Sequence, residues 1–128
     1  MDRATIEQSL YVLNFALLFT HQVDSAYWKE WELFHIPGGP QLNLVLNFAL
    51  LIVALVGLKL LVDGSTAGHA FSLLLAAAGV FAFSIHAFFL ARGNARFRLP
   101  VCLAVLTATL PVSVAQADLI KARRAEMN

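Results

Sequence analysis

Long apolar stretches alternate with short polar connections along the whole chain. A hydrocarbon core about 30 Å thick needs about 20 apolar residues in one helix. The stretches that approach this length cover about 6–23, 42–62, 69–90 and 99–120. Four crossings leave both termini on the same side of a membrane. We therefore predict an all-α fold, an antiparallel four-helix transmembrane bundle, with residues 1–128 forming a single integral membrane domain.

The connection between the first two stretches carries an unusual aromatic pattern. Tyr27, Trp31 and Phe34 are spaced four and three residues apart, with charged residues between them. This spacing places them on one face of a helix. Aromatic side chains favour the boundary between lipid and water, and charged side chains stay solvated there. We expect a short interfacial helix over 27–34, directly after the first span.

Composition supports the membrane assignment. Hydrophobic residues make up 59% of the chain and charged residues only 13%, whereas soluble domains have roughly 45–50% and 25%. The chain therefore has too little charge to cover a soluble surface, and its expected partner is the lipid bilayer. A net charge of +1 gives no sign of nucleic-acid binding. The single cysteine, Cys102, excludes an internal disulfide framework.

The basic residues give a preference for one orientation. Five lie on the side of the termini: Arg3, Lys59, Lys121, Arg123 and Arg124. Four lie on the other side: Lys29, Arg92, Arg96 and Arg98. Because cytoplasmic loops carry the excess of lysine and arginine, the termini are predicted to be cytoplasmic.

Polar residues within the spans gather at the end opposite the termini. His21 and Asp24 close the first span, Asn43 and Asn47 open the second, and His86 lies near the end of the third. Antiparallel helices bring these positions to a similar depth. Ionisable groups are costly inside a membrane, so they point to function. We predict that His21, Asp24 and His86 converge as a catalytic site.

These residue types suit a metal ion or acid–base chemistry. Two imidazoles, from His21 and His86, and one carboxylate, from Asp24, Glu30 or Glu32, match a catalytic zinc or non-haem iron with an open position. Without a divalent metal, the histidine–aspartate pair could transfer protons in an isomerase or hydratase. The expected substrate is a lipid or isoprenoid entering from that leaflet. The residues expected to contact such a ligand are Asn43, Asn47, Trp28 and Trp31.

Two other interpretations stay open. The protein could be a non-enzymatic accessory or assembly subunit, with a membrane-protein partner or a second copy docking on the segment around Trp31 and Phe34. The polar cluster would then only fix the register of the helices. Alternatively, His21 and His86 could be the axial ligands of a b-type haem.

The segment HQVDSAYWKEW at 21–31 resembles an uncharacterised family of small bacterial membrane proteins with four predicted helices. In that family the first helix ends in His-x-x-Asp-Ala, and Glu-Trp follows a few residues later. The segment is similar, more loosely, to the His-x-x-Glu-Glu domain proteins. Ser25 departs from the pattern, which has alanine there. The resemblance implies a bacterial inner-membrane protein and supplies no reaction. It also implies a set of signature residues: His21, Asp24, Glu30 and Trp31.

Overall fold

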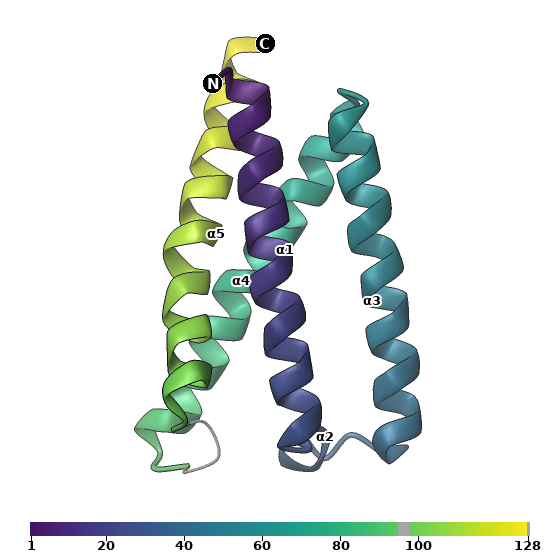
Figure 1. The fold of residues 1–128 in the computed structure, drawn as a ribbon, viewed down its shortest axis with the longest axis vertical. Helices are drawn as coiled ribbons and strands as arrows, with labels where there is room; N and C mark the ends of the chain where they lie inside the picture. Colours follow the sequence, from purple (N-terminus) through teal and green to yellow (C-terminus); the bar gives the residue numbers. More distant parts are fainter. Residues whose placement is uncertain (95–97, 128) are drawn as a thin grey trace.

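A computed structural model describes residues 1–94 and 98–127, the side chain of Met127 excepted, and these residues contain α-helices and no β-strand. The helices are α1 (Arg3–Tyr27), α2 (Glu30–Leu33), α3 (Gly39–Val62), α4 (Thr66–Ala91) and α5 (Pro100–Met127). The four long helices run alternately up and down, and the two termini lie at the same end (Figure 1). The predicted all-α class is confirmed. Arg96, which enters the charge count above, lies outside the described residues.

The interfacial helix is shorter than predicted. Helix α1 begins where the Asp2 side chain accepts the Thr5 N–H at 2.8 Å, and it continues through Tyr27, beyond the expected end at 23. The backbone then turns at Lys29, whose φ of 53° is left-handed. Only the four residues of α2 therefore form a separate helix, and the prediction of 27–34 was wrong at its start.

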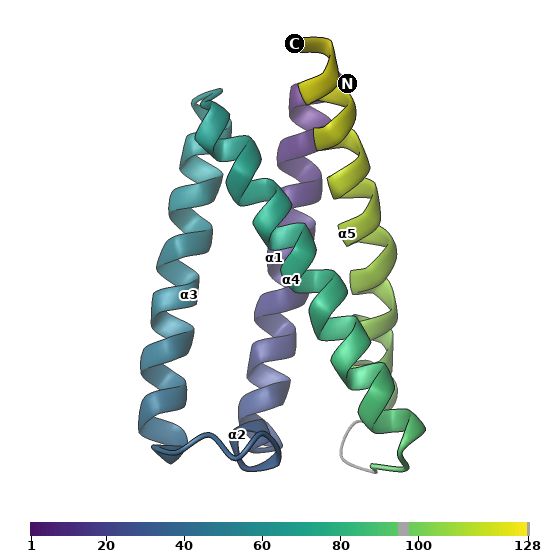
Figure 2. The ribbon, with the colours of Figure 1, turned by 180° about the vertical axis from the view of Figure 1, so that it is seen from behind.

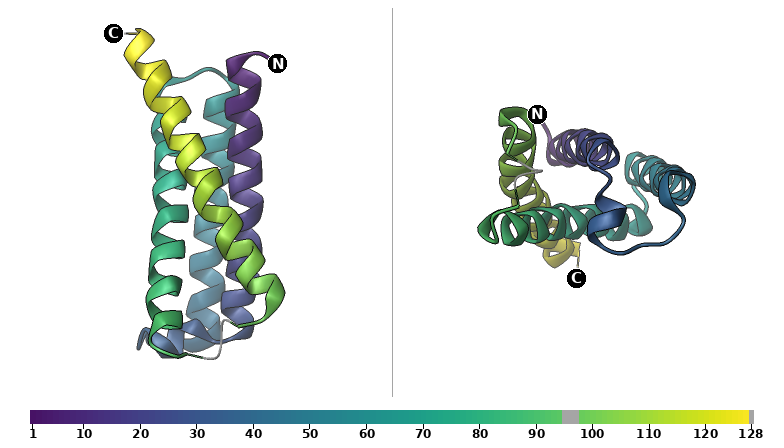
Figure 3. Two further views of the ribbon diagram at one scale, coloured as in Figure 1. Left: turned by 90° about the vertical axis from the view of Figure 1, so that its left-hand side faces the viewer. Right: turned by 90° about the horizontal axis from the view of Figure 1, so that it is seen from below.

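Helix α4 crosses the bundle diagonally. It begins beside the end of α3 near the termini and ends beside the start of α5 at the opposite end (Figure 2). Glycines allow this close packing, because small residues let helix backbones approach. A Cβ at Gly68 would collide with the backbone of α3, and one at Gly79 would collide with Ser113 on α5. The side view in Figure 3 shows α5 inclined across the bundle.

The molecule places polar side chains inside and large apolar side chains outside. Among the described residues, ten buried side chains are polar or charged and only five are hydrophobic. Large apolar side chains are exposed along all four long helices, including Phe48 and Phe81 at 65% and 67%. In water such a surface would be unstable, but in hydrocarbon it is the expected one. Helices α3, α4 and α5 are long and apolar enough to cross a membrane.

Candidate metal centre

Nine of the ten buried polar residues counted above fall into three groups along the bundle axis, and the tenth, Thr109, donates to the Val105 carbonyl of its own helix. At the end of the bundle where both termini lie, the carboxylate of Glu7 forms an ion pair with Arg123, and His69 Nε2 lies 3.8 Å from Glu7 Oε2. The Glu7 and His69 side chains are almost completely buried. Sequence reasoning missed Glu7 and Arg123, because a separation of 116 positions in the sequence leaves no local spacing signal.

The middle group, here called the amide layer, joins α1, α4 and α5. Asn14 Nδ2 donates to Gln116 Oε1 at 2.6 Å, and Ser113 donates to Asn14 Oδ1 at 3.2 Å. Gln116 Nε2 in turn donates to the Ser72 hydroxyl at 2.8 Å and to its carbonyl at 3.1 Å. All four side chains are fully buried. The amide layer therefore holds neutral polar groups whose hydrogen bonds are made within the bundle.

The third group, here called the donor cluster, is made of His21 on α1, Glu30 on α2 and His86 on α4. One potential ligand atom from each residue lies within 4.8 Å of the other two. His86 Nε2 is 2.8 Å from Glu30 Oε1, and the centroids of the His21 and His86 rings are 4.4 Å apart. Glu30 and His86 are buried, and His21 is half-buried. Two imidazoles and a carboxylate thus meet at one point.

Neighbouring groups hold two of these side chains in position. His86 Nδ1 lies 2.7 Å from the Ala82 carbonyl. A carbonyl only accepts, so this ring nitrogen carries the hydrogen. Ser25 donates its hydroxyl to Glu30 Oε2 at 2.7 Å. Metal-binding histidines and carboxylates in proteins are commonly oriented in this way by hydrogen bonds from groups behind them.

The Nε2 atom of His86 and the carboxylate of Glu30 need a positive charge between them. With Nδ1 carrying a hydrogen, Nε2 and Oε1 are both acceptors at 2.8 Å unless a proton or a metal ion lies nearby. Burial of Glu30 opposes its ionisation, but hydrogen bonds from His86 and Ser25 outweigh this effect and hold the pKa of Glu30 below its ordinary value. The pair therefore consists of an ionised carboxylate and a protonated imidazole, and a metal ion bound there would displace the proton from Nε2.

The backbone after α1 places Glu30 in the cluster. Lys29 adopts a left-handed conformation and is the N-cap of α2. This turn brings α2 back across the end of the bundle, as the view from below in Figure 3 shows. Ser25 and Glu30 lie on opposite sides of the turn. Both are buried, and they are joined by a hydrogen bond.

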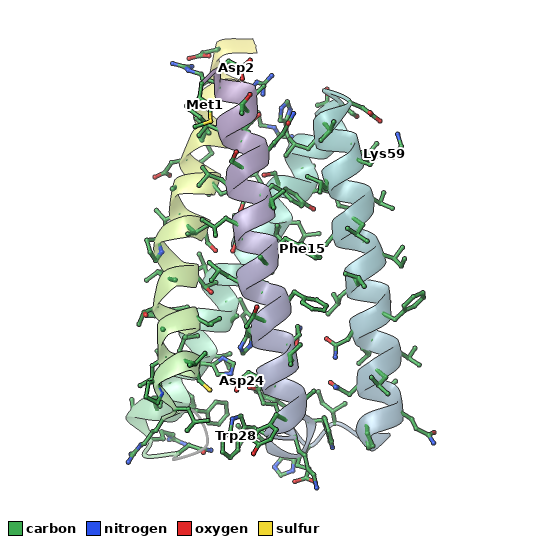
Figure 4. The ribbon with its side chains drawn as sticks, viewed as in Figure 1. Met1, Asp2, Phe15, Asp24, Trp28 and Lys59 are labelled. Atoms are coloured by element: carbon green, nitrogen blue, oxygen red, sulfur yellow. The ribbon has the colours of Figure 1, made fainter. Side chains whose placement is uncertain are left out.

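The other candidate carboxylates lie elsewhere. Asp24 Oδ1 accepts the thiol of Cys102 at 2.9 Å, so it faces α5 and is outside the donor cluster. Glu32 is exposed. Asp24 and Trp28 lie near the end of α1, and Phe15 lies about midway along it (Figure 4). The structure thus brings Glu30, of the three candidates, into contact with the histidines.

A cavity of about 590 Å³ lies against the donor cluster, between α1, α3 and α4. This volume is within the range of roughly 300–1,000 Å³ that small-molecule sites have. All three members of the donor cluster line it, together with Asn43 and Asn47. Trp31 also lines it, whereas Trp28 packs edge to face against Tyr27 with ring centroids 5.0 Å apart.

The histidine geometry does not suit a bis-histidine haem. The rings of His21 and His86 are in edge-to-face contact. A porphyrin bound by both would have to lie between them, which this contact prevents. The donor set fits a single ion better than a macrocycle.

Comparison with known proteins gives a family and no function. No curated protein and no solved structure matches the chain. One family model does match, over residues 7–123, and its description is a family of unknown function, DUF6713. The matched region contains the amide layer and the donor cluster. The expected membership of an uncharacterised family is confirmed: the chain belongs to the family of unknown function DUF6713.

Proposed function

We propose that this protein is a membrane metalloenzyme in which His21, Glu30 and His86 bind one divalent metal ion. The observation that carries the proposal is the convergence of two imidazoles and a carboxylate, from three different helices, beside a cavity. Three protein ligands and one position open to a cavity are typical of catalytic zinc sites, whereas structural zinc sites use four protein ligands.

The distances leave room for an ion after small side-chain rotations. Zinc lies about 2.0–2.1 Å from a histidine nitrogen, so two ligand atoms of a tetrahedral site are about 3.3 Å apart. The potential ligand atoms of the donor cluster are within 4.8 Å of one another. The same ligand set also suits ferrous iron, which accepts two histidines and one carboxylate.

The chemistry proposed is metal-assisted addition of water to a lipid substrate. A zinc ion held by these residues would lower the pKa of a bound water to about 7 and would polarise a substrate oxygen. The chain itself supplies the ligands, the hydrogen bonds from Ser25 and to Ala82 that orient them, and the amides of Asn43 and Asn47 at the cavity wall. The apolar walls exclude bulk water from the reacting groups.

We propose further that α1 is the fourth membrane span. Polar side chains lower its hydropathy, but Glu7 and Asn14 are buried against the other helices. Their burial removes the cost of placing them in lipid. In this arrangement residues 1–128 form one membrane domain in a bacterial inner membrane. The termini lie on the cytoplasmic side, and the donor cluster lies in the opposite leaflet.

Metal analysis of the purified protein in detergent tests the proposal. We expect about one zinc or iron per chain in the wild type by elemental mass spectrometry. His21→Ala and His86→Ala should lose this metal. His69→Ala is the matched control, because His69 is a buried histidine on the same helix as His86 and lies outside the donor cluster.

The control variant should keep the metal of the wild type. Equal metal content in all three histidine variants, or none in a wild type reconstituted with zinc or iron, would contradict the proposal. In that case the donor cluster is a buried ion pair that stabilises the helices, and the role of an accessory subunit is favoured.

A further inference from the structure

Helix α3 packs closely against α1 and α4 in the half of the bundle that holds the termini. Near the termini, the Tyr11 hydroxyl on α1 donates to the Ala54 carbonyl on α3 at 2.7 Å. Gly57 permits this approach, because a Cβ there would collide with Tyr11 and Phe71. Toward the other end α4 moves away from α3 to reach α5 (Figure 2). The cavity occupies the space that this divergence leaves, and we call it the α1/α3 groove.

The α1/α3 groove is apolar along most of its length and polar at one end. Its walls are mainly leucine, phenylalanine, valine and alanine side chains. The polar groups beyond Tyr11 are concentrated where α2 closes the bundle: His21, Gln22, Ser25, Glu30, Asn43, Asn47 and His86. A molecule that fits this distribution has one long apolar part and one compact polar end.

The groove has the length of a lipid chain. Its lining on α1 extends from Tyr11 to Ala26, and a rise of fifteen residues along an α-helix is about 22 Å. One leaflet of hydrocarbon is half of a core about 30 Å thick, or about 15 Å. An extended chain from the adjacent leaflet therefore fits between the donor cluster and Tyr11.

The groove opens sideways to the surface that faces the bilayer. Leu44, Leu50 and Phe81 line the groove and are also exposed on the outside, at 67%, 54% and 67%. The apolar wall is thus continuous with the lipid-facing exterior. Lipid molecules reach the groove from the bilayer without crossing water.

We propose that the α1/α3 groove binds the single hydrocarbon chain of a fatty-acyl amphiphile, with the oxygen atoms of its head group beside the donor cluster. Only the head-group part rests on the proposed metal site; the chain-binding part stands on the groove alone. The amides of Asn43 and Asn47 border the head-group end. A second chain of a diacyl lipid would lie outside, against the exposed face of α3.

Photolabelling with a diazirine-bearing palmitic acid in phosphatidylcholine vesicles tests this inference. We expect labelled peptides from α1 and α3 residues that line the groove, with labelling suppressed by unlabelled palmitic acid. Ala78→Phe should lower the labelling about tenfold or more, because the new ring fills the space the chain needs. Ala77→Phe is the matched control: Ala77 is the neighbouring alanine, is equally exposed, and does not line the groove.

The two proposals fail in different ways in this experiment, because metal content is measured on the same samples. Equal labelling of the Ala78 and Ala77 variants overturns the chain site, whatever the metal content. Loss of labelling in Ala78→Phe with metal retained supports it. Labelling that follows the groove in a protein without metal supports the chain site and overturns the metal site. A dimer in native mass spectrometry that Ala78→Phe dissociates, without specific labelling, assigns the groove to a second copy and overturns the inference.

Discussion

The amide layer and the donor cluster both join polar residues of α1 and α4, yet they differ in what their polar atoms face. In the amide layer, Asn14 and Gln116 bond to each other and to serines, and all are fully buried. In the donor cluster, the groups are titratable and border a cavity of about 590 Å³. A polar residue within a membrane helix is therefore a structural group where its partners complete its hydrogen bonds, and a candidate for chemistry where it faces open space.

Hydrogen bonding separates the two regions further. Within residues 1–94 and 98–127, the structure gives the ring of His21 contact with His86 but no hydrogen bond. Asn14, about two turns earlier on the same face of α1, has both its amide nitrogen and its amide oxygen in hydrogen bonds. His21, whose ring has no hydrogen bond within the described residues, thus lies at the cavity. Asn14, whose amide is hydrogen-bonded, lies in the packed interior.

The largest expected effect is on metal binding when the carboxylate of the donor cluster loses its charge. Glu30→Gln keeps the size of the side chain but removes the anionic ligand. We expect the Kd for zinc to rise by more than the roughly 10–100-fold that changes in supporting residues produce. Competition with a chromophoric chelator measures this. The matched control is Glu32→Gln, at an exposed position of the same helix, and an equal loss there would remove the distinction between the two glutamates.

A smaller effect is expected when only the support of Glu30 is removed. Ser25→Ala deletes the hydroxyl that donates to Glu30 Oε2. The Kd for zinc should rise by about 10–100-fold, because the carboxylate is no longer oriented. Ser84→Ala is the control, since its hydroxyl donates to the Val80 carbonyl of its own helix and Ser84 lies outside the donor cluster. An unchanged Kd in Ser25→Ala would show that the turn at Lys29 alone positions the glutamate.

Substitutions in the amide layer should lower the stability of the protein and leave metal binding unchanged. Asn14→Leu removes the hydrogen-bond partner of Gln116 Oε1 and of the Ser113 hydroxyl, so the free energy of unfolding should fall by about 1–3 kcal/mol. Thermal unfolding in detergent measures this, with metal content unchanged. Adding Gln116→Leu should recover part of the loss, because an apolar pair leaves fewer unpaired groups. A loss of metal in Asn14→Leu would mean that the two regions are not independent.

The smallest effect is expected for a polar pair outside both regions. Lys59 and Asp63 form an exposed ion pair four residues apart near the end of α3. Asp63→Asn should change stability by no more than about 0.5 kcal/mol. A larger change in the same unfolding assay would show that membrane solvation, rather than burial among helices, determines the cost of losing a polar contact.

The apolar pattern was sufficient to predict the long helices but not their packing. Each stretch is long enough to form a helix, and the structure has one at each. The diagonal path of α4 depends on Gly68 and Gly79 meeting particular partners on α3 and α5. Nothing in the spacing of these glycines within α4 identifies those partners.

For a similar reason, the sequence did not determine which carboxylate belongs to the donor cluster. The i, i+3 spacing of His21 and Asp24 favoured Asp24, but the Asp24 carboxylate accepts the thiol of Cys102 on α5. Glu30 reaches the histidines only because Lys29 takes a left-handed conformation, which is uncommon for a residue other than glycine. A residue type that rarely adopts this conformation gives no signal for it in the sequence. His21 and His86, by contrast, could be paired by depth alone.

The position of Glu30 on the link between α1 and α3 has a thermodynamic consequence. A ligand that separates α3 from α1 pulls on the same short connection that carries the carboxylate. Any change in metal affinity caused by an occupied groove must then be matched by an equal change in chain affinity caused by the metal, since coupling free energies between two sites are reciprocal. Measuring palmitic acid affinity with and without zinc gives the size and sign of that coupling, and the sign tells whether the occupied groove draws Glu30 toward the histidines or away from them.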